Sequence, residues 1–140
     1  MPPRTAISVA LAKPPDEKIT INLGYVDLGQ IDLLVQEGFY ANRTDLIRTA
    51  IRNQLATHAD VVKQAVARKT LVLGIQKFTA ADLHAVKKAG DQLDIRVLGL
   101  ASIASDVTPE LALAAINSVV VLGALHASPS VKAALASRIR

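Results

Sequence analysis

The chain has 140 residues, 51% hydrophobic and only 3% aromatic, so it can form one or two small domains with cores of mainly Ala, Val, Leu and Ile. It contains no cysteine, which excludes disulfides and thiolate metal sites and favours an intracellular, cytoplasmic protein. The net charge of +4 is too small to indicate nucleic-acid binding by itself, and no apolar run is long enough to span a membrane.

The first fifteen residues carry Arg4 and Lys13 and no acidic residue. The stretch AISVALA after Arg4 is similar to the apolar core of a secretion signal, but it is short and lies between two Pro-Pro pairs. We therefore expect residues 1–15 to form a flexible, weakly basic arm, with a signal peptide as the alternative.

The stretch KITINL, residues 18–23, alternates polar and apolar side chains and stops at Gly24. Alternation predicts a strand with one buried apolar face and one polar face, and the polar face carries Lys18, Thr20 and Asn22. Because a lone strand leaves its backbone groups unpaired, we expect another strand to pair with it.

Two helices are expected after this strand. The segment YVDLGQIDLLVQEG has apolar residues at helical spacing and ends at Gly38, a candidate left-handed C-cap. Asn42 is a candidate N-cap for the second helix, and Asp45, three residues later, resembles a capping box. Since no Gly or Pro occurs over residues 39–73, we expect this helix to run past His58 as a stalk.

A strand and two helices in about 50 residues cannot bury enough surface to be stable alone. Pairing the strand with its copy from a second chain would satisfy its backbone groups and close one core over four helices. The sequence therefore predicts a homodimer, with an antiparallel ribbon on a two-fold axis.

The rest of the chain contains an internal repeat. The letters VLG occur three times and are followed each time by a helix start with Thr or Ser as the cap. The VLG copies lie at residues 72–74, 97–99 and 121–123, and the helix starts are TAAD (79–82), TPEL (108–111) and SPSV (128–131). Apolar stripes follow in each helix, with Leu83 and Val86, Leu111 and Ala115, and Val131 and Leu135.

Each repeat thus predicts a short apolar strand, a loop and a helix. The strands alternate little, as expected when both faces of a sheet are covered, and we expect a parallel, solenoid-like sheet with right-handed crossovers. The consensus of leucine-rich repeats is absent. The two outer strands would have open edges that invite association. The alternative is an irregular small α/β domain in which the repeat is accidental.

The polar strand face suggests a DNA interface. A two-stranded antiparallel ribbon fits the major groove, where Lys18 can donate to guanine, Asn22 can pair with adenine, and Thr20 offers a hydroxyl and a methyl group. The start of the second helix has free backbone N–H groups at Arg43 and Thr44, beside Asn42. Such a helix N-terminus can hold a phosphate and fix the register of the ribbon.

These residues resemble the ribbon-helix-helix family of DNA-binding proteins, of the MetJ/Arc/CopG type. The likeness covers residues 17–56, through KITINL, LGQIDLLVQEG and NRTDLIRTAIRNQL. It implies an obligate dimer, base reading by Lys18, Thr20 and Asn22, and a phosphate clamp at Asn42, Arg43 and Thr44. Many relatives carry several cations on the strand, whereas here only Lys18 is basic, so non-specific affinity would depend on Arg43, Arg48, Arg52 and the amino-terminal arm.

The predicted organisation is α+β. It comprises the arm, a ribbon-helix-helix domain over 16–57, a helical linker over 58–69, and a strand–helix repeat domain over 70–140 for oligomerisation or partner binding.

Other interpretations stay open for single residues. The polar strand face is also compatible with ordinary solvation, and Arg48 and Arg52, four apart, also fit a solvated face or intrahelical ion pairs. His58, His84 and His126 have no metal-binding spacing and are expected at the surface. No catalytic constellation and no cofactor motif is visible, so we expect no enzyme.

The leading functional hypothesis is a sequence-specific transcriptional regulator, a repressor, whose carboxy-terminal repeats join dimers along double-stranded DNA. The alternatives are an antitoxin that neutralises a protein toxin through residues 70–140, and a partition or DNA-organising protein that polymerises through its repeats.

Overall fold

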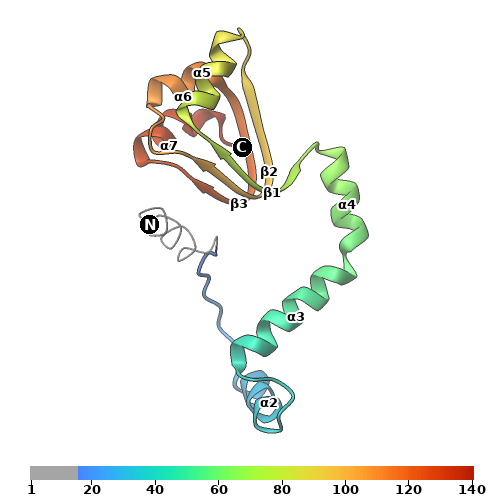
Figure 1. Cartoon of the computed structure of the whole chain (residues 1–140). Coiled ribbons are helices and arrows are strands. Elements are labelled where there is room, and N and C mark those ends of the chain that lie inside the picture. The colour runs from blue at the N-terminus through green and yellow to red at the C-terminus, as the bar shows by residue number, and fades with distance from the viewer. Residues whose placement is uncertain (1–15) are drawn as a thin grey trace, which may run out of the picture. The chain divides into compact units, whose positions relative to one another are not determined.

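The computed structural model describes residues 16–140 and divides them into two compact units, Glu17–Ala65 and Val66–Arg140 (Figure 1). We call them the amino unit and the carboxy unit and describe each by itself. The predictions for the arm concern residues 1–15 and lie outside the described part. Across the described residues, no helix has the length and apolarity that a membrane crossing requires.

The amino unit contains helix α2, Tyr25–Gln36, and helix α3, Arg43–Thr57. Residues 16–24, which include the predicted strand, have neither helical nor strand structure in the single chain. A strand is defined by hydrogen bonds to a neighbour, and the expected neighbour is the same segment of a second chain. The strand therefore stays a prediction about the dimer.

The turn after α2 has the geometry that the sequence predicts. Gly38 has a φ of +87°, in the region that favours glycine. Its N–H donates to the carbonyl of Val35 at 3.1 Å, and the N–H of Phe39 donates to that of Leu34 at 3.0 Å. These two bonds form a Schellman motif, which satisfies carbonyl groups at the end of the helix.

The expectation of one continuous second helix is wrong. Helix α3 ends at Thr57, and a separate helix α4, Ala59–Arg68, follows it. At the junction, His58 has φ −104° and ψ 15°, and its N–H donates to the carbonyl of Leu55 at 3.1 Å, three residues back. This tight last turn interrupts the helix without help from Gly or Pro.

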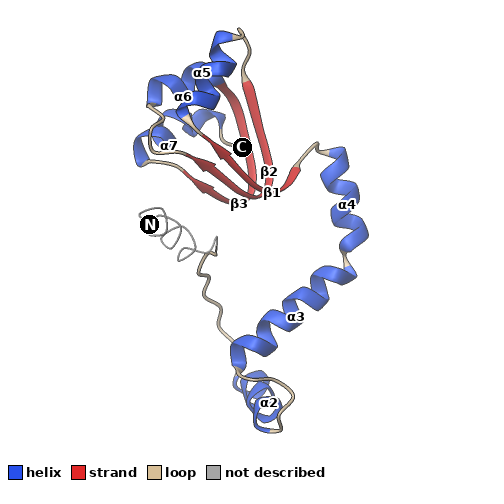
Figure 2. Ribbon diagram, in the orientation of Figure 1, coloured by secondary structure: helices blue, strands red, loops and turns tan. Residues whose placement is uncertain are grey.

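The carboxy unit is a three-stranded parallel sheet in the order β1-β2-β3, as the repeat predicts (Figure 2). Strands alternate with helices along the chain. The strands are β1 (Val72–Phe78), β2 (Leu93–Ile103) and β3 (Ile116–His126), and the helices are α5 (Ala80–Lys88), α6 (Pro109–Ala115) and α7 (Pro129–Leu135), followed by the short 3-10 helix η1 (Ala136–Arg138).

The three VLG copies lie side by side, with Gly74 paired to Gly99 and Gly99 to Gly123. All three glycines have positive φ angles, of 127°, 139° and 122°. A Cβ on Gly99 would lie 2.1 Å from the carbonyl oxygen of Gly74, and one on Gly123 would lie 2.0 Å from that of Gly99. The backbones approach so closely there that no side chain fits, which explains glycine at both positions.

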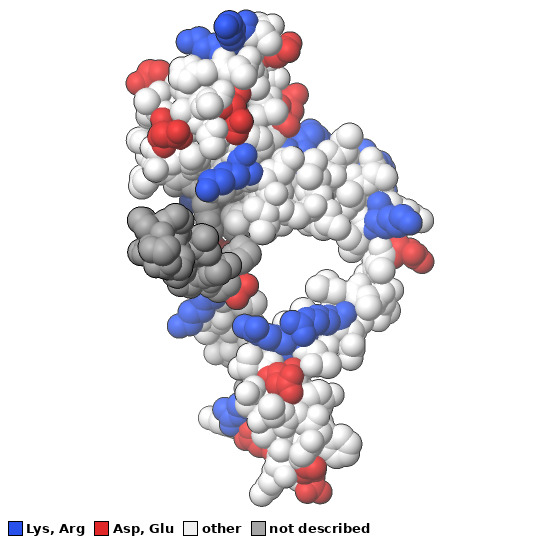
Figure 3. Space-filling model, in the orientation of Figure 1, with Lys and Arg blue, Asp and Glu red and all other residues white. Residues whose placement is uncertain are grey.

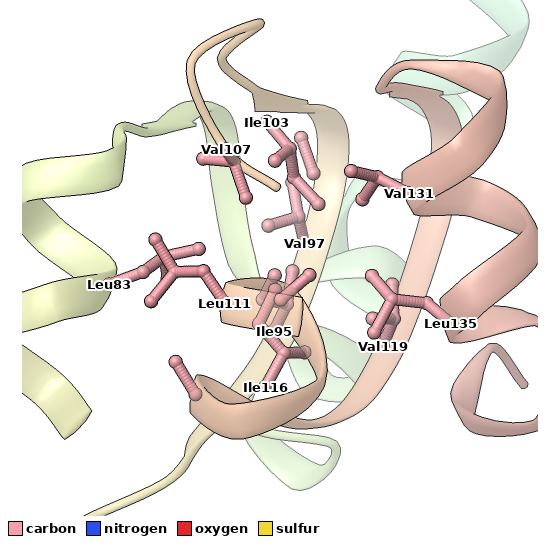
Figure 4. Packing of buried hydrophobic residues seen from close by; sticks show 13 residues of the cluster. Leu83, Ile95, Val97, Ile103, Val107, Leu111, Ile116, Val119, Val131 and Leu135 are labelled. Carbon is pink, nitrogen blue, oxygen red and sulfur yellow. The ribbon is translucent and has the colours of Figure 1, made fainter. Parts of the chain in front are cut away.

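The helix starts also follow the sequence pattern. The hydroxyls of Thr79, Thr108 and Ser128 accept hydrogen bonds from backbone N–H groups three residues later, and Thr79 and Asp82 form a complete capping box. The capped helices pack leucine and valine side chains onto β2 and β3 (Figure 4). The fully buried core side chains include Leu83, Ile95, Val97, Ile116, Val119, Val131 and Leu135.

Only one face of this sheet is covered, contrary to the expectation from the weakly alternating strands. The three helices lie on the same side of the sheet (Figure 1). Successive right-handed crossovers in a constant direction place every helix on one face. Apolar side chains continue on the bare face, where Leu73 is 70% exposed and Leu122 is 50% exposed. Within Val66–Arg140 nothing covers these side chains, and exposed apolar surface of this kind commonly marks an association site.

An acidic group ties the start of β2 to that of β3. The Oδ1 atom of Asp94 accepts hydrogen bonds from the Ser118 hydroxyl at 2.7 Å and from the Asn117 amide at 2.9 Å. These bonds, first that from Ser118, hold the pKa of Asp94 below its ordinary value of 3.8. They lie where the register between the two strands shifts, next to Leu93.

We expect Gly99→Ala to unfold the carboxy unit, because its Cβ would collide with the Gly74 carbonyl and its φ of 139° is strained for alanine. Circular dichroism and thermal melting measure the loss. The control is Gly29→Ala in α2, where a Cβ meets nothing within 4 Å and should add roughly 0.5–1 kcal/mol of stability. A wild-type melting curve for Gly99→Ala would contradict this account of the sheet.

We expect Asp94→Ala to lower the melting temperature at neutral pH. The lowered pKa means that the stabilisation is present above the ordinary value of 3.8 and is lost as the pH falls through the folded value. The difference between variant and wild type should therefore vanish in acid, in melting curves recorded from pH 7 to pH 2. Asp91→Ala, an exposed acid nearby, is the control and should melt like wild type throughout.

Candidate nucleic-acid interface

The predicted base-reading residues lie on the extended segment before α2. Lys18, Thr20 and Asn22 are all exposed. The apolar residues between them are exposed as well, with Ile19 at 75% and Ile21 at 60%. Among the described residues of one chain, the polar face and the apolar face of this segment are both exposed to solvent. The alternation therefore has a structural meaning only if a partner covers the apolar side.

Helices α2 and α3 of the amino unit are likewise not covered. No residue of α2 or α3 is buried, and large apolar side chains such as Leu33, Phe39, Ile51 and Leu55 are exposed. An isolated unit of this size with no buried residue has no hydrophobic core to offset its conformational entropy. The amino unit thus carries the surface of a core that a single chain does not close.

The start of α3 has the geometry of an anion site. The Oδ1 atom of Asn42 accepts the Asp45 N–H at 2.8 Å, which confirms the predicted cap. The other Asp45 contact departs from a capping box, because its carboxylate accepts from the N–H of Ala41 at 2.9 Å. Among the described residues, the N–H groups of Arg43 and Thr44 have no acceptor in the chain. These two donors, at the positive end of a 15-residue helix, suit a phosphate oxygen.

Arg43 has a second role that the sequence did not reveal. Its guanidinium donates to both carboxylate oxygens of Asp32, Nε to Oδ1 at 2.7 Å and Nη2 to Oδ2 at 2.8 Å. This bidentate ion pair ties α3 to α2, and the Arg43 hydrogen bond holds the pKa of Asp32 below its ordinary value. The backbone of Arg43 therefore stays available to a phosphate, while its side chain is already engaged.

Arg48 and Arg52 are exposed one turn apart on α3. Over residues 16–140 the single salt bridge is the Arg43–Asp32 pair, so the intrahelical ion pairs considered for Arg48 and Arg52 are absent. Basic side chains gather over α3 in the space-filling view (Figure 3). Two unpaired cations on the helix that carries the anion site extend its positive surface.

The three histidines lie at the surface, as expected. His58, His84 and His126 are exposed, and His58 is 3.3 Å from the amide nitrogen of Gln54 through its Nε2. In the part of the chain that the structure describes, no group of three His, Cys, Asp or Glu residues is arranged to hold a metal ion.

Comparison with known proteins gives one match. The family model described as the ribbon-helix-helix transcriptional regulator family matches residues 14–132. No curated protein and no solved structure matches the chain. The match confirms the resemblance that residues 17–56 indicate, and it extends through β1, β2 and β3 into α7, which the sequence motifs assign to no family. Because it spans most of the chain, the protein belongs to the ribbon-helix-helix family of DNA-binding transcriptional regulators.

Proposed function

We propose that this protein is a sequence-specific repressor that binds operator DNA as a homodimer. Two copies of residues 18–23 pair into an antiparallel ribbon, and their polar side chains enter the major groove. One observation carries the proposal. The chain belongs to a family of DNA-binding regulators, yet α2 and α3 of its amino unit contain no buried residue. The segment before α2 is extended and exposes Lys18, Thr20 and Asn22.

Dimerisation follows from the exposed apolar residues. Burying Ile19, Ile21 and Leu23 with the apolar faces of α2 and α3 would supply the core that the single unit lacks. At about 25 cal/mol per Å² of apolar surface, covering three such side chains contributes several kcal/mol. The ribbon adds backbone hydrogen bonds for residues 18–23, which make none with other described residues of their own chain.

Base reading and phosphate binding divide between two elements. In the proposed complex, Lys18 and Asn22 contact base edges, and Thr20 contacts a base or a methyl group. The free N–H groups of Arg43 and Thr44 hold a backbone phosphate, with Asn42 as the cap and Arg48 as a neighbouring cation. Asp32 competes with DNA for the Arg43 side chain, so this arginine contributes mainly by fixing α3 against α2.

The carboxy unit is proposed to join dimers on the DNA, in the cytoplasm. Binding several linked dimers raises the effective concentration at neighbouring sites. A protein that organises or partitions DNA by the same association is the second candidate, and the bare sheet face of Leu73 and Leu122 favours it. An antitoxin role is less well supported, because the carboxy unit has its own core and the usual toxin-binding tail is disordered.

We expect Ile21→Lys to abolish the dimer, because it places a charge in the proposed core between the two chains. The neighbouring change Thr20→Lys adds the same charge on the polar face and should leave the dimer intact. Sedimentation equilibrium measures both variants across protein concentrations. Equal association of the two variants would contradict the proposed faces of the strand.

We expect Lys18→Ala and Asn22→Ala to weaken binding to the selected operator by about 1–3 kcal/mol each and to relax its sequence preference. An operator is first selected from random DNA with the wild-type protein, and gel-shift titrations then compare the variants. Lys132→Ala and Asn53→Ala, which remove the same groups from exposed helical positions elsewhere, are the controls. Wild-type affinity for both reader variants would refute base reading by this segment.

A further inference from the structure

The glycine of the first VLG copy, in the outer strand β1, lacks the close contact that the other two glycines make. Gly99 and Gly123 must lack side chains because the carbonyl of the preceding strand occupies the space of their Cβ atoms, at 2.1 and 2.0 Å. Gly74 has the same unusual backbone, with φ +127°, yet a Cβ there would meet nothing within 4 Å. At Gly99 and Gly123, the Cβ would point at the glycine carbonyl of the neighbouring strand. By analogy, the Cβ of Gly74 would point at such a carbonyl if a further strand lay beside β1.

The opposite edge of the sheet offers a matching carbonyl. Gly123 is the last glycine of the row, and among residues 16–140 no further strand follows β3 in the sheet. The one addition at that edge is a single bridge between Val119 and Ile139, with the Arg140 N–H donating to Val119 at 2.9 Å. That bridge lies before the VLG register, so residues 121–126 pair with no other described residue on that side.

The apolar surface of the sheet points the same way. In the register, Leu73 pairs with Leu98 and Leu98 with Leu122, and Ile75 pairs with Leu100. At the β1 edge these rows end in the open, with Leu73 70% and Ile75 62% exposed. On the helix side of the same strand, Val72 is 43% exposed. End repeats of a stable stack normally carry polar caps. The β1 residues from Val72 to Ile75 are apolar on both faces, and its two polar side chains, Gln76 and Lys77, come only at the end of the strand.

We propose that the carboxy unit binds a second copy of itself head to tail, with β3 of one copy adding parallel to β1 of the next. The register would continue unchanged, so that the Gly123 carbonyl of one chain lies against Gly74 of the other. This pairing gives Gly74 the same steric reason to be glycine that Gly99 and Gly123 have. It would also extend the leucine row across the contact and give Val72 a neighbouring repeat.

A head-to-tail contact has a consequence for assembly. A pair of copies still has one free β1 edge and one free β3 edge, so the association does not end at two. The two carboxy units of a ribbon-helix-helix dimer would therefore connect to different dimers and form a chain of them. This inference deepens the oligomerisation within the proposed function, but it does not depend on which bases the ribbon reads.

Cysteine cross-linking tests the register directly, because the protein has no cysteine of its own. In the proposed contact, Ile75 of one copy lies beside Ala124 of the next, as Leu100 lies beside Ala124 within the chain. The full-length variant carrying Ile75→Cys and Ala124→Cys should give, under mild oxidation, a ladder of species larger than two chains that collapses on reduction. The control pairs Ile75→Cys with Val120→Cys, four residues away from Ala124 along β3 and about 13 Å out of register.

Each outcome decides the matter. A ladder for the in-register pair but not for the control supports the proposal. Absence of cross-linking, equal cross-linking of the control, or covalent species no larger than two chains would overturn it. Cross-linking by Ile75→Cys alone would instead indicate two β1 edges paired about a two-fold axis, and cross-linking by Leu98→Cys alone would indicate stacked sheet faces.

Gly74→Ala, added to the in-register pair, tests the steric argument. Its Cβ has open space within one chain, so the only cost there is the strain of alanine at a φ of +127°. The unit should therefore keep its circular dichroism spectrum with a lowered melting temperature, while the ladder should be lost. Gly90→Ala is the matched control, since Gly90 also has a positive φ, +77°, and nothing within 4 Å of a Cβ. A ladder that survives Gly74→Ala would refute the proposed position of the Gly123 carbonyl.

Gel shifts of the same variants on a single operator test base reading separately, because an isolated dimer still binds when the chain of dimers is lost.

Discussion

The structure depends first on an imbalance in the amino unit, which has apolar side chains but no way to bury them within one chain. Its helices are well formed, with a capped start at Asn42, a Schellman end at Gly38 and a clamp between Arg43 and Asp32. These local features fix the path of the backbone but remove little apolar surface from water. In the proposed dimer, a second chain supplies the missing core, and the surface left outside is the polar one that faces DNA. Under that proposal, the same short segment serves both dimerisation and DNA recognition.

The carboxy unit differs from the amino unit in this respect. It buries a core of its own, with helices from three successive repeats packed on one face of a parallel sheet. Close backbone contact at the glycines fixes the register of the strands, because any side chain there would collide with a carbonyl. The bare face and the open edges follow from the same topology, since repeats that advance in one direction cover only one side. The unit therefore has a core of its own and also exposed apolar surface that a partner could cover.

Local sequence patterns predicted much of this arrangement. The VLG spacing predicted a parallel sheet, and the Thr and Ser residues before each helix predicted the caps. The apolar stripes that contain Leu83, Leu111 and Val131 predicted which helix faces are buried in the core. What failed depends on longer-range geometry. The break at His58 comes from backbone bonding in the last turn of α3, with no Gly or Pro to signal it. The bare face could not be predicted, because an apolar strand has the same sequence pattern whether its own chain or another chain covers it. The Arg43–Asp32 pair joins residues eleven apart, beyond any helical spacing.

The repeat design also has an evolutionary side. Each strand and helix carries its own glycine and its own cap, and corresponding residues recur after 25 and 24 positions, from Val72 to Val97 to Val121. Duplication of a gene segment of that length would insert one more layer, while every existing neighbour keeps its contacts. The size of the carboxy unit is thus open to change by one repeat at a time, independently of the amino unit, which is proposed to contact the operator.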